Sequence, residues 1–320
     1  MHQARSNRTP TAVRDRGEAE SLVAREVDSA ALVTMGKRTR WAAWVGALVL
    51  VAASLSPSPA DPAFSIRLAP SALRQGETAQ VLIRTSVPLS TIRLSFQGRS
   101  WPLYHVRGEW RTYLATDPTT PHGRLPLLIE AVTARGERIT IRRTVAVTKV
   151  SFPVRRLTFD PSKQPLLSPE VAEWEQQRVR EALRILAPEP LWAGPFLIPV
   201  PGEVLSPYGV LNIYQGQVWG FHRGVDLAAE AGTPVRAGNH GIVRLAEALP
   251  LSGNAILLDH GLGVVTSYLH LSRISVSQGQ RVKKGEIIGL VGSTGLATGP
   301  HLHWGMRVNG VHVDPLPWTR

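Results

Sequence analysis

Hydrophobic and polar residues alternate in short stretches between residues 64 and 150. The clearest alternating stretches are residues 79–84, 91–96 and 139–145. Turn-forming triplets with a central glycine lie between such stretches, at residues 75–77, 97–99, 107–109 and 135–137. A period of two with turns at this spacing is typical of strands in an antiparallel sandwich. The pattern therefore predicts an all-β sandwich over residues 61–150, with the size of an immunoglobulin-like module.

The period of the pattern changes in residues 151–200, which we interpret as a linker with one helix. Ser168 suits the N-cap and Pro169 the first helical position, whereas Pro188 and Pro190 would end a helix. We therefore expect a helix from Pro169 to about residue 187. Its apolar stripe would consist of Val171, Trp174, Val179, Leu183 and Leu186. Its solvated face would carry Arg178, Arg180 and Arg184.

Short apolar runs and glycines alternate again from residue 201 to the end of the chain. The runs are residues 241–245, 255–259, 263–270 and 286–291. No helical period longer than a turn or two is present. Residues 201–320 are therefore predicted to form a second all-β domain, and the fold class of the whole chain is all-β.

Residues 37–60 have the layout of an export signal. Lys37, Arg38 and Arg40 precede an apolar run over residues 41–55, and small residues then lead to a cleavage site after Ala60. The run is shorter than the roughly 20 residues that span a bilayer, so an uncleaved anchor is the second interpretation. The polar, Arg-rich stretch before Met35 suggests that Met35 is the true start; the alternative is a cytoplasmic extension. Either way, residues 1–60 predict export to the periplasm, the cell envelope or the exterior.

Composition narrows the chemistry further. The chain of 320 residues has no cysteine, which excludes disulfides, thiol catalysis and thiolate metal sites. Its formal net charge of +12 predicts affinity for polyanions, such as anionic polymers of a bacterial wall. Nucleic acid is not expected as a partner, because no nucleic-acid-binding motif accompanies the charge.

Histidines cluster in the last domain, and three groupings have spacings that suit a metal site. His222 and Asp226 are four residues apart, with a glycine between them that permits a turn. His301 and His303 are two residues apart, so in a strand both side chains would lie on one face. His270 ends an apolar run.

These residue types favour zinc. Imidazole and carboxylate without sulfur can supply three protein ligands and leave a fourth position open, as in catalytic zinc sites. The remaining histidines have no such partners. We interpret His240, His260 and His312 as turn or surface residues, and His105 and His122 as isolated surface or structural residues.

Several motifs in the last domain resemble the lysostaphin/LytM-type zinc metallopeptidases, which are bacterial peptidoglycan endopeptidases. The motifs are HRGVDL at 222–227, GTPV at 232–235, GN at 253–254, YLHLS at 268–272 and GSTGLATGPHLH at 292–303. The resemblance covers roughly residues 201–316. It implies an antiparallel β domain of the duplicated-hybrid-motif type with an open groove.

The resemblance also implies roles for individual residues. His222, Asp226 and His303 would bind one Zn²⁺ per chain. His270 and His301 would be the catalytic pair that assists water and the transition state. A tyrosine upstream of the first ligand would donate to the oxyanion; Tyr214 is the nearest candidate and Tyr208 the next.

The resulting functional prediction is an exported zinc metalloendopeptidase that hydrolyses peptide bonds of peptidoglycan, in remodelling or lysis of the wall. The stem-peptide cross-link is favoured over glycine bridges as its target. Contact with the membrane is expected only through the leader. One alternative is a catalytically silent envelope scaffold or activator of wall amidases, and another is a polyanion-binding module.

Overall fold

The computed structural model describes residues 64–320. The predicted export signal, its cleavage site after Ala60 and the start at Met35 lie outside the described residues. Strands dominate the described part of the chain, which confirms the all-β fold class. Residues 64–320 contain no helix long and apolar enough to cross a membrane.

Residues 64–148 form two sheets that share one core. One sheet has the strand order β1-β3-β7-β6 and the other β2-β9-β8-β4-β5. The strands are β1 Phe64–Ala69, β2 Ala72–Arg74, β3 Thr78–Thr85, β4 Leu89–Phe96, β5 Arg99–Trp101, β6 Tyr104–Val106, β7 Glu109–Ala115, β8 Gly123–Thr133 and β9 Arg138–Thr148.

Burial in these strands follows the sequence period. In β3, Ala79, Val81 and Ile83 are buried, and the residues between them are more exposed. The three alternating stretches lie within β3, β4 and β9, so these strand predictions are confirmed. The likeness to an immunoglobulin domain stays a prediction.

The stretch predicted as a linker contains β10 (Val154–Leu157), the 3₁₀ helix η1 (Pro161–Leu167) and the α-helix α2 (Pro169–Ala182). Ser168 caps α2 as predicted, because its Oγ accepts a hydrogen bond from the Val171 N–H. The helix ends at Ala182, about five residues before the expected end.

The predicted faces of α2 need two corrections. Trp174 does not belong to the buried stripe, since it is 54% exposed, whereas Val179 is buried in one hydrophobic cluster with Leu245 and Leu257. Arg178 does not lie on a purely solvated face, because it forms an ion pair with Glu247 of the neighbouring sheet at 2.7 Å. Both differences arise because the sheet beneath the helix decides which side is covered.

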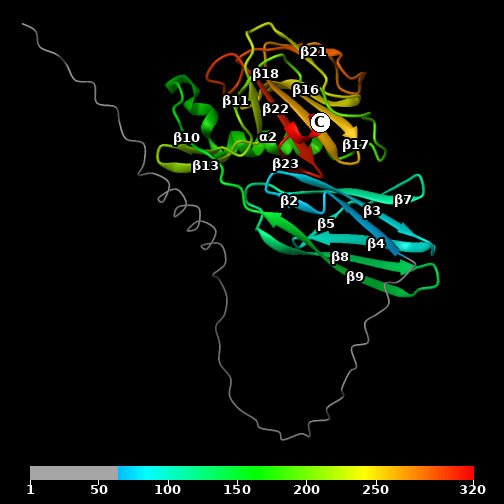
Figure 1. The fold of residues 1–320 in the computed structure, drawn as a ribbon. Coiled ribbons are helices and arrows are strands. Elements are labelled where there is room, and N and C mark those ends of the chain that lie inside the picture. The colour runs from blue at the N-terminus through cyan, green and yellow to red at the C-terminus, as the bar shows by residue number, and fades with distance from the viewer. Residues whose placement is uncertain (1–63) are drawn as a thin grey trace, which may run out of the picture. The chain divides into compact units, whose positions relative to one another are not determined.

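The C-terminal part contains three sheets (Figure 1, green to red). The largest has the order β11-β14-β22-β18-β17-β16-β20, with β23 paired to β22; the others are β15-β21-β19 and β10-β12-β13. The strands are β11 Val204–Ser206, β12 Leu211–Tyr214, β13 Gln217–Phe221, β14 Gly224–Leu227, β15 Pro234–Arg236, β16 Gly241–Leu249, β17 Gly253–Gly261, β18 Val264–Leu271, β19 Arg273–Ile274, β20 Arg281–Val282, β21 Ile287–Leu290, β22 Leu302–Val308 and β23 Val311–Val313. A last 3₁₀ helix, η2, spans Leu316–Thr319.

Strand pairing brings together segments that are far apart in the sequence. In the β14–β22 ladder Asp226 is the register partner of His303, and in the β18–β22 ladder Leu269 is the partner of the same residue. Trp304 and Leu302 are fully buried on the other face of β22. The pleat therefore turns His303 away from the core and toward the end of β18.

Candidate metal centre and active site

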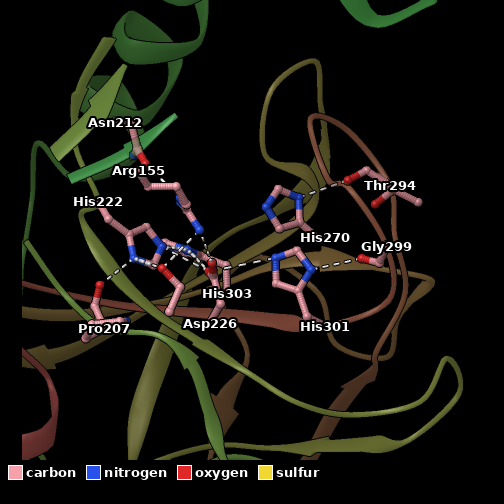
Figure 2. A network of polar contacts seen from close by, with 11 residues as sticks. Arg155, Pro207, Asn212, His222, Asp226, His270, Thr294, Gly299, His301 and His303 are labelled. Carbon is pink, nitrogen blue, oxygen red and sulfur yellow. Dashed lines mark hydrogen bonds and ion pairs between the residues drawn. The ribbon is translucent and has the colours of Figure 1, made fainter. Parts of the chain in front are cut away.

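Three of the predicted ligands converge on one point. Asp226 Oδ1 lies 3.0 Å from His222 Nε2 and 2.9 Å from His303 Nδ1, and these two nitrogens are 3.1 Å apart. One potential ligand atom from each residue lies within 4.8 Å of the others. Figure 2 shows the three side chains directed toward each other from separate segments. Two imidazole nitrogens and a carboxylate oxygen at this spacing suit a zinc ion with an open position.

Backbone geometry makes room for this cluster at Gly224. A Cβ at this position would lie 2.7 Å from His303 Nε2 and 2.6 Å from the Trp304 carbonyl oxygen. Real side chains do not reach such distances, so glycine is required for β14 to approach β22 closely here. Gly224 is the first residue of β14 and has no positive φ, so it serves close packing against β22 rather than the turn expected from the sequence.

A backbone carbonyl orients the first histidine. His222 Nδ1 lies 2.8 Å from the Pro207 carbonyl oxygen, and a carbonyl can only accept, so Nδ1 carries the hydrogen. Nε2 then has its lone pair free on the side of Asp226 and His303. Hydrogen bonds of this kind fix the tautomer and ring orientation of histidines in metal sites.

The charges in the cluster also suit a cation. Burial alone would raise the pKa of Asp226, but the adjacent His222 and His303 rings hold that pKa well below its ordinary value. Burial lowers the pKa of His303. An ionised carboxylate beside neutral imidazole is the protonation state that binds a metal.

His270 and His301 form a separate pair beside the cluster. Their ring centroids are 5.1 Å apart, and the His270 ring is 6.1 Å from the His303 ring. His270 Nδ1 donates to the Thr294 carbonyl, and His301 Nδ1 donates to the Gly299 carbonyl; the nitrogen–oxygen distance is 2.9 Å in both. Each ring therefore has its Nε2 lone pair available for a proton. Figure 2 shows the pair on the opposite side of the site from His222.

The environment of His270 favours the neutral ring. Burial, and then the neighbouring His303 and His301, lower the pKa of His270 to about 3. Its backbone has a φ of +63°, which is uncommon for residues other than glycine and recurs at functional sites. The backbone is held there by hydrogen bonds such as that from its N–H to the Ser252 carbonyl.

The two tyrosine candidates differ in their contacts. Tyr208 is buried and donates from its hydroxyl to the His312 carbonyl at 2.7 Å. Tyr214 lies on β12, where its ring packs against Phe159 and Trp219 with centroids 5.2 and 5.8 Å away. The oxyanion role of Tyr214 stays a prediction.

One charged side chain at the site was missed by sequence reasoning. Arg155 Nη1 lies 4.0 Å from Asp226 Oδ2, and Figure 2 shows its guanidinium directed toward the cluster. The residue comes from β10, which was predicted to be part of a linker. The parallel pairing of β10 with β12 places Arg155 beside the cluster, and no motif around Arg155 predicts that pairing.

The predicted position of His260 at a turn or on the surface is wrong. It is fully buried rather than at a turn or surface. Its Nδ1 donates to the His240 carbonyl and its Nε2 lies near Thr266 Oγ1, each at 2.7 Å. The apolar run that precedes it in β17 was the available signal. His240 and His312 are partly buried, and His122 is exposed.

Comparison with known proteins finds similarity over part of the chain. The model of peptidase family M23 matches residues 220–315. The DD-carboxypeptidase/endopeptidase Mpg of Neisseria meningitidis serogroup B is 45% identical over 114 residues, which are 36% of this chain and 26% of that protein. The peptidoglycan DD-endopeptidase ShyC of Vibrio cholerae is 45% identical over 94 residues, 29% of this chain and 22% of that protein. The matched region thus spans about a quarter of the length of these curated relatives.

A solved structure extends the similarity beyond this domain. A crystal structure from Pseudomonas aeruginosa, assigned to peptidase M23, has a TM-score of 0.55 and 28% sequence identity. The alignment covers 77% of this chain and 94% of that one. The shared fold therefore reaches well outside residues 220–315.

Proposed function

We propose that residues 220–315, which match the model of peptidase family M23, form a peptidase domain, and that the chain is a zinc-dependent endopeptidase that hydrolyses peptide bonds in bacterial peptidoglycan. The observation that carries this proposal is the convergence of His222, Asp226 and His303 beside a second histidine pair. The name of ShyC supports the choice of peptidoglycan, and the DD-endopeptidase activity in the names of both ShyC and Mpg supports bonds between D-amino acids.

The donor set fits Zn²⁺. His222 Nε2, Asp226 Oδ1 and His303 Nδ1 would hold the ion, and the absence of cysteine leaves nitrogen and oxygen as the available donors. A bound Zn²⁺ supplies a Lewis acid that polarises a carbonyl and lowers the pKa of water to about 7.

The chain's own contribution to the reaction is proton transfer and orientation. We assign His270 and His301 to this task, because each Nδ1 donates to a backbone carbonyl and leaves Nε2 as the nitrogen that can exchange a proton with the substrate or water. One would accept a proton from the attacking water, and the other would donate to the leaving amine or stabilise the oxyanion. The low pKa of His270 keeps its Nε2 unprotonated at neutral pH.

The proposed place of action is the cell envelope. The leader predicted over residues 37–60 and the net charge of +12 both suit a protein exported toward anionic wall polymers. The name of ShyC, a peptidoglycan DD-endopeptidase, favours the same compartment.

Digestion of purified peptidoglycan tests the proposal. We expect the zinc-loaded protein to release muropeptides whose masses identify a cut cross-link, a chelator to abolish the release, and added Zn²⁺ to restore it. His303→Ala serves as the control that lacks a ligand. Absence of cleavage, combined with faster cleavage by an added wall amidase, would contradict an enzyme and favour an activator.

A further inference from the structure

The guanidinium of Arg155 is fixed in place by neutral partners. Its Nε donates to Asn212 Oδ1 at 3.0 Å, and its Nη1 donates to Ser206 Oγ at 3.1 Å. Asn212 and Ser206 are both buried, and Asn212 is the register partner of Arg155 in the β10–β12 ladder. The side chain is therefore built into the wall of the site.

A second anchor holds the same segment on the other side of the site. Lys163 of η1 donates from Nζ to the carbonyls of Gly295 and Ala297, at 2.8 and 2.5 Å. Thr294, whose carbonyl accepts from His270, and Gly299, whose carbonyl accepts from His301, belong to the same loop region. Residues 154–163 thus reach both the cluster of metal-ligand candidates, through Arg155, and the loop that orients His270 and His301, through Lys163.

Arg155 shares its carboxylate partner, Asp226, with the metal cluster. Within residues 64–320, Arg155 forms an ion pair with Asp226, in which Nη1 lies 4.0 Å from Oδ2. That distance is too long for a hydrogen bond. The other oxygen of Asp226 faces His222 and His303, where a bound cation would take up the carboxylate's charge. The Arg155 side chain is 38% exposed, so a substrate can reach it.

We propose that Arg155 is a further catalytic residue, which stabilises the negative charge that develops on the substrate carbonyl oxygen; this rests on the proposed function. In the step concerned, water adds its oxygen to the carbonyl carbon and gives a proton to an imidazole, and the π electron pair moves to the carbonyl oxygen. On collapse this pair re-forms the carbonyl, the C–N bond breaks, and the amine leaves with a proton from an imidazole. Arg155 faces the charged oxygen between these two events.

The position of Arg155 favours the reacting oxygen over a remote substrate carboxylate. Ser206 Oγ contacts both Arg155 Nη1, at 3.1 Å, and His222 Nδ1, at 3.3 Å. The Ser206 side chain thus links the guanidinium of Arg155 to His222 of the metal cluster. A preorganised donor at the developing charge changes kcat, whereas a contact to a distant carboxylate changes KM.

Kinetics of Arg155→Met and Arg155→Lys on a defined cross-linked muropeptide test the proposal. For Arg155→Met we expect kcat to fall about 10²–10³-fold, as for loss of an oxyanion donor, while KM changes by less than about threefold. Arg155→Lys should retain part of the wild-type kcat, because it keeps the positive charge but lacks the planar set of N–H donors of the guanidinium. Arg156→Met, at the next and exposed residue of the same strand, is the matched control and should leave kcat unchanged.

Two measurements beside turnover complete the test. The dissociation constant for Zn²⁺, from competition with a chelator, should be the same for wild type and Arg155→Met. A phosphinate analogue of the cleaved peptide, which mimics the oxyanion, should bind the variant about 100-fold more weakly, while an uncleaved peptide binds equally.

Three results would overturn the inference. They are unchanged kcat in Arg155→Met, a rise in KM alone, which would indicate a substrate carboxylate, and loss of Zn²⁺, which would indicate a role in holding Asp226. Lack of chelator-sensitive cleavage by the wild type would instead overturn the proposed function, and this inference with it.

Discussion

The site has two halves: the cluster of His222, Asp226 and His303, and the pair His270 and His301. Both imidazoles of the cluster contact one carboxylate oxygen, whereas, within residues 64–320, neither imidazole of the pair has a carboxylate within hydrogen-bonding distance. His222 and His303 both lie within 3.0 Å of Asp226 Oδ1. His301 Nε2 is 3.7 Å from the same atom, and the recorded hydrogen bond of the His270 side chain goes to the Thr294 carbonyl. The four rings are alike chemically, so their neighbours decide which can hold a cation and which can carry protons.

The comparison separates metal binding from proton transfer. The half that contains Asp226 combines an anion with lone pairs directed at one point, which is what a metal requires. The half that contains His270 and His301 fixes each Nδ1–H on a carbonyl and leaves each Nε2 free. Substitutions in the two halves should therefore have different consequences.

The largest effect is expected for Asp226→Ala. Removing the shared carboxylate leaves His222 Nε2 and His303 Nδ1 facing each other without an anion, so both zinc and activity should be lost. The loss of zinc affinity should exceed the 10–100-fold that typically follows loss of an outer partner. Metal analysis and muropeptide release measure the two quantities. Glu230→Ala, an exposed acid of the same domain, should alter neither.

His270→Ala should spare the metal and impair the reaction. We expect zinc content to equal that of the wild type and kcat to fall about 10²–10⁴-fold, the range for loss of a general acid or base. Loss of zinc in this variant would place His270 among the ligands. His122→Ala, at an exposed histidine immediately before β8, is the control.

Gly224→Ala should weaken the metal half without removing a ligand. The added Cβ would displace His303 Nε2 or the Trp304 carbonyl, so zinc affinity should drop about 10–100-fold. Gly299→Ala lies in the other half, where a Cβ meets nothing within 4 Å, and should keep full affinity. Melting curves of both variants will show whether Gly224→Ala still folds; equal zinc affinity in the two folded variants would contradict this account of the packing.

A smaller effect is expected from His260, a buried histidine outside both halves. Burial lowers its pKa to about 4 in the folded chain, against an ordinary value of 6.5. Between these values the unfolded chain binds more protons, so stability falls as pH drops from about 6.5 to about 4, by up to roughly 3 kcal/mol. Unfolding of chelated wild type and His260→Gln across this range should give a flatter pH dependence for the variant. Parallel curves would show that His260 does not contribute.

Sequence reasoning found the parts of this site that depend on short-range spacing. His222 with Asp226 and His301 with His303 are local pairs, and turns or strand alternation bring each pair together. It missed Arg155, because a parallel pairing between β10 and β12 joins residues that are more than fifty positions apart. It also misplaced Trp174 and His260, since burial of these side chains depends on neighbouring elements that a local pattern does not contain.

The zinc content of His303→Ala and His301→Ala, measured together with cleavage of peptidoglycan, tests the division of the site most directly. The two residues are neighbours on one face at the start of β22, so differences in folding or access should affect them alike. The account predicts that His303→Ala lacks both zinc and activity, whereas His301→Ala keeps zinc and loses most of its turnover. A zinc-free His301→Ala beside a zinc-loaded His303→Ala would contradict it.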